Sequence, residues 1–149
     1  MRLNVIVIIF ALLILGLWSN VITENNSIGG LIPRSDSNSY FTDSLRILNG
    51  MKASYISTRT NFTVFLSFLL LITKQNMQIT LAIIIFIAAL VSYFSYELIL
   101  REFGSIPSIV FFLLIFIFYR PSSGKFMTEN IGFILGLLGF SLLIIYLKN

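Results

Sequence analysis

Two acidic residues, each near an arginine and beside an apolar stretch, have the types and spacing that could do chemistry. Asp36 follows Arg34 in the polar segment after the first apolar run, and Glu129 follows Arg120 in the polar segment before the last one. Only 6 of the 149 residues are Asp or Glu, so their positions carry information. Carboxylates and arginines at such a boundary could bind a metal ion, hold a phosphate or accept a proton.

The composition places these residues in a membrane protein. Hydrophobic residues make up 57% of the chain and charged residues 11%, and the mean hydropathy is +0.95. A water-soluble fold needs more polar surface than this sequence supplies. The chain has no His and no Cys, so a general base or metal ligand must be a carboxylate. The net charge of +4 forms no basic run, so we expect no nucleic-acid partner.

The apolar runs predict a single, all-α transmembrane domain over residues 1–149 with about four spanning helices. Residues 3–18 resemble a signal peptide, but the small-residue cleavage pattern is missing after them, which favours an uncleaved signal anchor. The other expected spans are 79–100, 105–119 and 131–147. Phe62–Thr73 is shorter than the roughly 20 residues that a span needs. We expect it to be interfacial, re-entrant or half of a hairpin.

The polar segment after the anchor contains one predicted amphipathic helix, Ser37–Asn49. Asp36 or Ser37 can cap its start and Gly50 can end it. Asp43 is expected on the water-facing side, and the helix is expected to lie on the membrane surface. Its apolar face is formed by residues at helical spacing, namely Phe41, Leu45 and Leu48.

Topology decides whether Asp36 and Glu129 can meet. If Phe62–Thr73 does not span, residues 20–78 form an outer loop with juxtamembrane helices, and both acids lie on the outer face. If it does span, they lie on opposite faces. The short run favours the first arrangement, in which short-loop cations fall inside, as the positive-inside rule requires: Arg2, Arg101 and Lys148.

The same arrangement leaves seven cations outside. A purely structural loop has little need of them, whereas a site for a phosphate-bearing substrate would explain them. They are Arg34, Arg46, Lys52, Arg59, Lys74, Arg120 and Lys125.

Two further patterns concern helix packing. Glu97 and Arg101 are four residues apart on one helix face, which predicts a local ion pair. Gly132 and Gly136 form a GxxxG pair, which we expect to pack within the protein rather than to dimerise. No span carries a charge at mid-membrane, which argues against a small transporter or channel.

The segments around the two acids resemble a known family. Asp36-Ser-Asn-Ser-Tyr40, followed by Leu45-Arg-Ile-Leu-Asn-Gly50 and Ser57-Thr-Arg59, resembles the first outer loop of GT-C membrane glycosyltransferases, which use polyprenyl-phosphate sugars. Tyr119-Arg-Pro121 through Thr128-Glu129 resembles their second outer loop. Family members have many more helices. The resemblance therefore implies the N-terminal portion of a longer enzyme, inactive as these residues alone.

The resemblance also implies a role for each residue. Asp36 would be the general base for an acceptor hydroxyl, and Glu129 would assist with the acceptor or bind a divalent metal. Arg59 and Arg120 would neutralise the phosphate of an undecaprenyl- or dolichyl-phosphate sugar. Glu129 stands where many relatives use Asp, which leaves its metal role open. The implied location is the cell (inner) membrane, with the lipid bilayer and the lipid-linked donor as partners.

Plainer roles compete with these assignments. Asp36 can be a helix N-cap, Glu129 can simply favour the dipole at a helix start, and Arg120 can be an interfacial anchor. The alternative function is a non-catalytic accessory subunit of a larger membrane complex, which would co-purify with partner membrane subunits.

Overall fold

The computed structural model describes residues 4–11, 36–53 and 60–148, and those residues are helical with no strand among them. The all-α fold expected from the sequence is therefore confirmed for this part of the chain. The apolar runs of the sequence correspond to helices that begin and end within a few residues of the expected positions.

Two helices are long and apolar enough to cross a membrane. They are α4 (Met77–Phe103) and α6 (Thr128–Lys148). The third apolar helix, Ser105–Tyr119, is shorter than a typical span. Half of the expected anchor 3–18 lies outside the described residues, and the other half, residues 4–11, is helical. The structure thus gives two candidate spans, and four are not shown.

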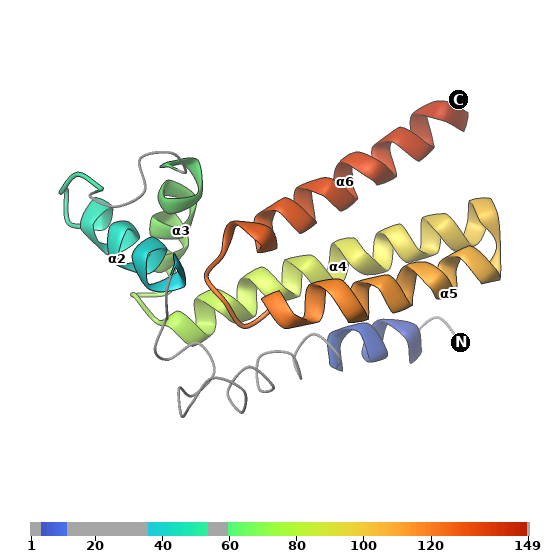
Figure 1. Cartoon of the computed structure of the whole chain (residues 1–149), viewed down its shortest axis with the longest axis horizontal. Helices are drawn as coiled ribbons and strands as arrows, with labels where there is room; N and C mark the ends of the chain where they lie inside the picture. The colour runs from blue at the N-terminus through green and yellow to red at the C-terminus, as the bar shows by residue number, and fades with distance from the viewer. Residues whose placement is uncertain (1–3, 12–35, 54–59, 149) are drawn as a thin grey trace.

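Helix α4 and the chain after it form an antiparallel hairpin (Figure 1). The side-chain oxygen of Asn76 caps the start of α4 by accepting a hydrogen bond from the Ile79 amide at 3.0 Å. Gly104 ends α4 with φ at +89° and ψ at −171°, a conformation open almost only to glycine. Helix α5 (Ser105–Leu114) starts directly afterwards. Pro107 lies in its first turn, where its missing N–H costs no hydrogen bond.

Helix α6 returns along α4 and packs against it (Figure 1). The Ser95 and Ser141 hydroxyls form a buried hydrogen bond of 2.9 Å between the two helices. At their far ends Glu102 pairs with both Arg101 and Lys148. These contacts give α4 and α6 a fixed register.

A second, smaller unit is formed by α2 (Asp36–Leu48) and α3 (Thr60–Ile72), which pack on one another. Ser44 donates a hydrogen bond to the Thr63 carbonyl at 3.1 Å, and the Tyr40 ring meets the Phe62 ring edge to face at 5.0 Å. Gly50, with φ at +73°, ends α2 as expected. The Met51 amide donates to the Arg46 carbonyl across this turn, as in a Schellman cap.

The two ends of the hairpin are chemically different. We call one the α2 end: it comprises α2, α3 and the loop 120–127 between α5 and α6. We call the other the Gly104 end, where Lys148 also lies (Figure 1). Asp36 is the first residue of α2, and Glu129, in the first turn of α6, directly follows the loop 120–127, so both lie at the α2 end. The expectation that they share one side, away from Arg101 and Lys148, agrees with this arrangement.

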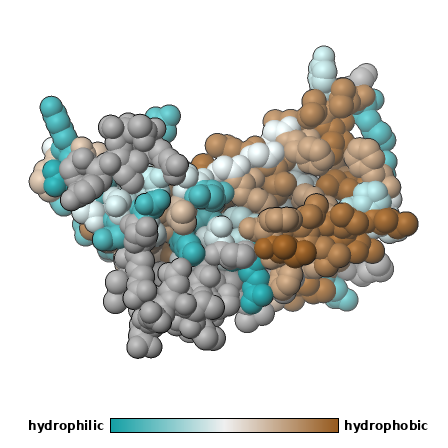
Figure 2. Space-filling view, in the orientation of Figure 1, coloured by the Kyte–Doolittle hydropathy of each residue, from teal (hydrophilic) through white to brown (hydrophobic). Residues whose placement is uncertain are grey.

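Large apolar side chains remain exposed along the helices. Figure 2 shows hydrophobic residues over the hairpin and α6 and more hydrophilic ones toward the α2 end. Few residues of α5 and α6 are buried in the core. The outward-facing side chains of these helices are not covered by the rest of the described chain. The most exposed among them include Ile106, Leu135, Leu142, Tyr146 and Leu147.

Two packing predictions were wrong. Asp43, expected to face water, is 0% exposed. The buried face of α2 consists mainly of polar residues, not of the apolar residues that the spacing indicated. The buried residues are Ser37, Tyr40, Asp43 and Ser44. The glycine face of α6, expected to pack inside the protein, is open. No described atom lies within 4 Å of where a Cβ would stand on Gly132 or Gly136, because α6 packs through Ile134, Ser141 and Ile144.

Candidate functional site

The start of α2 is joined to the loop 120–127 by direct contacts. The Phe126 amide donates a hydrogen bond to the Ser37 hydroxyl at 2.9 Å, although 89 residues separate them in the chain. The Phe126 ring stacks on the Phe41 ring with centroids 5.7 Å apart. Phe126 is almost fully buried. These contacts bring together the two segments that the sequence singled out.

Both predicted carboxylates stand at helix starts at this end. Asp36 is the first residue of α2, directly before Ser37, and it is exposed. Glu129 lies in the first turn of α6 and is also exposed, with the Thr128 hydroxyl 3.3 Å from its Oε2. A carboxylate in the first turn of a helix is favoured by the helix dipole. The plainer structural role expected for each acid is therefore satisfied, and both side chains stay accessible to a ligand.

Arg120 follows an irregular stretch of helix. The chain widens into a π-helix over Ile115–Tyr119 and then tightens into a 3-10 turn over Arg120–Ser122. Such π segments are rare and are often found at functional sites. The Arg120 guanidinium carbon lies 5.0 Å from the centre of the Phe116 ring. Its Nε is enclosed and has no hydrogen-bond partner, so the guanidinium keeps donor capacity for another group.

Two buried polar residues were not singled out by the sequence: Tyr119, next to Arg120 in the chain, and Asn130, in the first turn of α6. The Tyr119 ring lies flat on the Phe133 ring of α6, with centroids 3.8 Å apart, and its hydroxyl lacks a hydrogen bond. Asn130 donates through Nδ2 to the Lys125 carbonyl, while its Oδ1 has no partner. Unsatisfied buried polar atoms are uncommon in folded proteins. The one sequence signal for these two residues was that each is a polar residue at the end of an otherwise apolar run.

Asp43 is a further residue that the sequence placed wrongly. It is fully buried in α2 and has an interaction partner there. A buried carboxylate is costly unless it is paired. Because its side chain is fully buried, we assign Asp43 to the packing of the α2 end rather than to contact with a ligand.

The residues described at this end do not fit a metal site. Nowhere in 4–11, 36–53 or 60–148 do three Asp or Glu side chains gather as ligands of one ion. A divalent metal held by Glu129 therefore has no supporting donor set among them. Arg59, expected to bind phosphate, lies outside the described residues.

The α2 end thus combines two accessible carboxylates, an arginine with unused donor capacity and enclosed polar atoms next to it. Such a set can accept a proton and can neutralise an anionic group. Comparison of the chain with protein-family models, with curated proteins and with solved structures finds no match. The functional argument therefore rests on these residues.

Proposed function

We propose that the chain is the N-terminal portion of a membrane glycosyltransferase that transfers a sugar from a polyprenyl-phosphate donor. The observation that carries the proposal is the hydrogen bond between Ser37 and Phe126. It ties the segment of Asp36 to the loop that leads from Arg120 to Glu129. A carboxylate base and a phosphate-binding arginine are the groups that such a transfer needs.

In this proposal the protein is a multi-pass protein of the cell (inner) membrane, with the α2 end on the outer side. The exposed apolar side chains of α5 and α6 support it, because lipid would cover them. The 27 residues of α4 extend about 40 Å at 1.5 Å per residue, which matches a bilayer with its headgroup regions. Residues 3–18 and 105–119 would complete the four spans, the latter with local thinning of the bilayer.

The chemistry assigns a task to each group. The acceptor oxygen attacks the sugar carbon bonded to the phosphate oxygen, and that carbon–oxygen bond breaks. The phosphate leaves with the electron pair, and Arg120 neutralises its charge. Asp36 takes the proton of the acceptor hydroxyl. Glu129 orients the acceptor at the neighbouring helix start.

The test is sugar transfer in membranes that contain the native protein. We expect Asp36→Asn and Asp36→Ala to lower the rate about 10²- to 10⁴-fold, as loss of a general base does, while insertion is unchanged. Arg120→Ala should also lower it. Lys148→Gln, a cation at the Gly104 end whose side chain is 59% exposed, is the matched control and should keep the rate. Retained transfer in both correctly inserted Asp36 variants would contradict the proposal.

A second candidate is a non-catalytic accessory subunit of a larger membrane complex. The open glycine face of α6, formed by Gly132, Gly136 and Gly139, favours it. Small residues let the backbone of another membrane helix approach closely. Extraction in a mild detergent should then yield the chain together with larger subunits, and Gly136→Leu should release them. A monomer after mild extraction would contradict this candidate.

A further inference from the structure

Arg101, predicted to pair with Glu97, forms an ion pair with Glu102. Arg101 Nε donates to Glu102 Oε1 at 2.8 Å, although Glu102 is the next residue in the chain. Lys148, at the end of α6, pairs with the other oxygen of Glu102. Glu102 is thereby fixed between two cations. Its contact turns the Arg101 guanidinium away from the direction that Glu97 takes.

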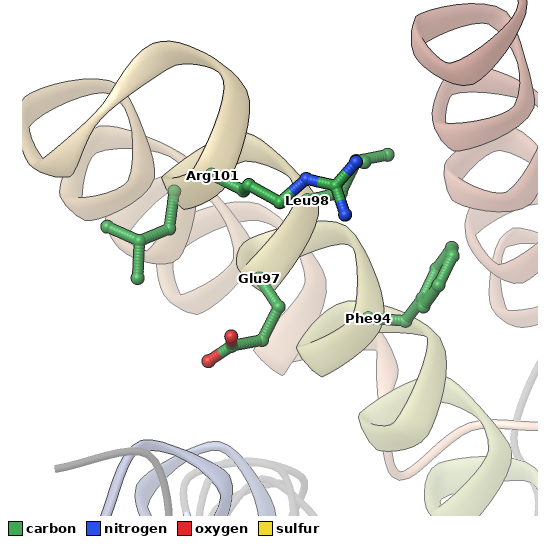
Figure 3. A pocket seen from close by; sticks show the side chains of 5 residues that line it. Phe94, Glu97, Leu98 and Arg101 are labelled. Atoms are coloured by element: carbon green, nitrogen blue, oxygen red, sulfur yellow. The ribbon is translucent and has the colours of Figure 1, made fainter.

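A cavity of about 410 Å³ lies on this face of α4. Figure 3 shows that the Glu97 and Arg101 side chains leave the helix in different directions, with Phe94 on the same side as the guanidinium. The cavity therefore has a negative group on one side and a positive group on the other. Its lining residues are Phe94, Glu97, Leu98, Leu100 and Arg101.

Both charged groups can accept a further partner. The Arg101 side chain is 80% exposed, and its bond to Glu102 uses only Nε, which leaves the two terminal nitrogens for an anion. Glu97 is half-buried and has interactions of its own. A carboxylate has about four lone-pair sites for hydrogen bonds, so it can also accept from a cationic donor.

An apolar track leads up to this cavity along α4. Ile87, Leu90 and Phe94 are 36%, 43% and 48% exposed. Their spacing of three and four residues continues through Glu97 to Arg101, so the five residues lie on one face of the helix. The opposite face of α4 is buried, for example at Ala88 and Ser95. The exposed face is thus apolar along its length and charged at its end.

The charged end lies at headgroup depth if α4 crosses a bilayer. From Glu97 to the last residue of α4, Phe103, the helix rises about 9 Å at 1.5 Å per residue. The polar headgroup regions account for the outer part of the roughly 40 Å that a bilayer measures. A lipid lying along the track would place its acyl chain on Leu90 and Phe94 and its headgroup at the cavity.

We propose that this face of α4 binds a phospholipid whose headgroup carries an ammonium group. The terminal nitrogens of Arg101 bind the phosphate, Glu97 binds the ammonium, and an acyl chain lies along Phe94, Leu90 and Ile87. Separated charges of both signs favour a zwitterion over an anionic lipid. The site is at the Gly104 end, opposite the proposed catalytic end, and it requires membrane insertion but no sugar transfer.

The experiment is lipid retention by the intact protein, measured by native mass spectrometry after exchange into mixed micelles. The probes are phosphatidylethanolamine, its N-acetylated form, which has lost the cation, and phosphatidylglycerol. We expect the wild type to retain phosphatidylethanolamine about tenfold over the other two, as one charge-assisted hydrogen bond allows. Glu97→Gln should bring the preference close to one. Arg101→Gln should lower retention of all three lipids.

Lys52→Gln, at the other end of the molecule, is the matched charge control and should behave as wild type. Equal retention of the three lipids by the wild type would overturn the proposal, and so would an unchanged preference in Glu97→Gln. If a variant fails to insert, the comparison of the amine with its N-acetylated form on wild-type protein decides alone. The readout does not involve transfer activity, so it stands or fails separately from the proposed function.

Discussion

Replacing Ser37 by alanine tests the contact on which the functional site depends. The Ser37 hydroxyl accepts the Phe126 amide at 2.9 Å, and both residues are buried. Alanine would leave that N–H enclosed without a partner, at a cost of about 1–3 kcal/mol. At about 2 kcal/mol, the open state of the loop becomes roughly 30-fold more populated, since about 1.4 kcal/mol is tenfold.

Hydrogen exchange followed by mass spectrometry reads this population directly. Exchange of the Phe126 amide and its neighbours in the loop 120–127 should accelerate by about that factor, while exchange in the middle of α4 stays unchanged. Ser39→Ala, a half-buried serine of the same helix, is the matched control and should have little effect. An unchanged loop exchange rate in Ser37→Ala would refute the docking of α2 on this loop.

Three further predictions concern the free energy of unfolding in micelles, measured by denaturant titration. Asp43→Ala should destabilise by about 1–3 kcal/mol, because it removes a fully buried polar side chain together with its interaction. The exposed Asp36→Ala should cost no more than about 1 kcal/mol, and equal losses would contradict the burial of Asp43. Gly104→Ala should cost about 1–3 kcal/mol, because φ is +89° there. Gly132→Ala, with open space around it, should stabilise by about 1 kcal/mol, because alanine favours the helix. A larger loss of stability at Gly132 than at Gly104 would contradict the backbone conformations of the two glycines. Lys74→Gly should stabilise by about 1 kcal/mol, because Lys74 has φ at +52°, and a loss of stability would argue against that turn.

The sequence predicted the positions of the helices well because their signals are local. The Asn49–Gly50 stop of α2 and the proline in the first turn of α5 depend only on neighbouring backbone. The apolar runs set the extents of α4 and α6. The shortness of α3 was also visible, since it follows from counting apolar residues between polar ones.

The errors arose where a partner element decides which face is buried. The helical periodicity predicted that Asp43 faces water. In the structure, α3 and neighbouring segments cover the face of α2 that carries Asp43 together with Ser37 and Tyr40. The rule for residues four apart indicated Glu97 as the partner of Arg101, but it did not indicate the ion pairs of Glu102 with Arg101 and Lys148. Spacing within one helix carries no information on such distant partners.

The candidate site was predicted in part. Asp36, Glu129 and Arg120 were chosen from the sequence; they lie at the start of α2, at the start of α6 and in the 3-10 turn that opens the loop 120–127. Tyr119 and Asn130 were missed, because a sequence does not show which buried polar atoms lack a hydrogen bond. That depends on tertiary packing, such as the stacking of the Tyr119 ring on Phe133.

The central claim is that both acids act at one side of a membrane that α4 and α6 cross. The chain has no cysteine, so single cysteines at Asn76, Met127, Ser105 and Lys148 can be labelled in sealed membranes with an impermeant maleimide. The account predicts labelling from outside at Asn76 and Met127, and labelling at Ser105 and Lys148 only after the membrane is opened. Labelling of Asn76 and Met127 from opposite sides, or of all four from outside, would contradict it.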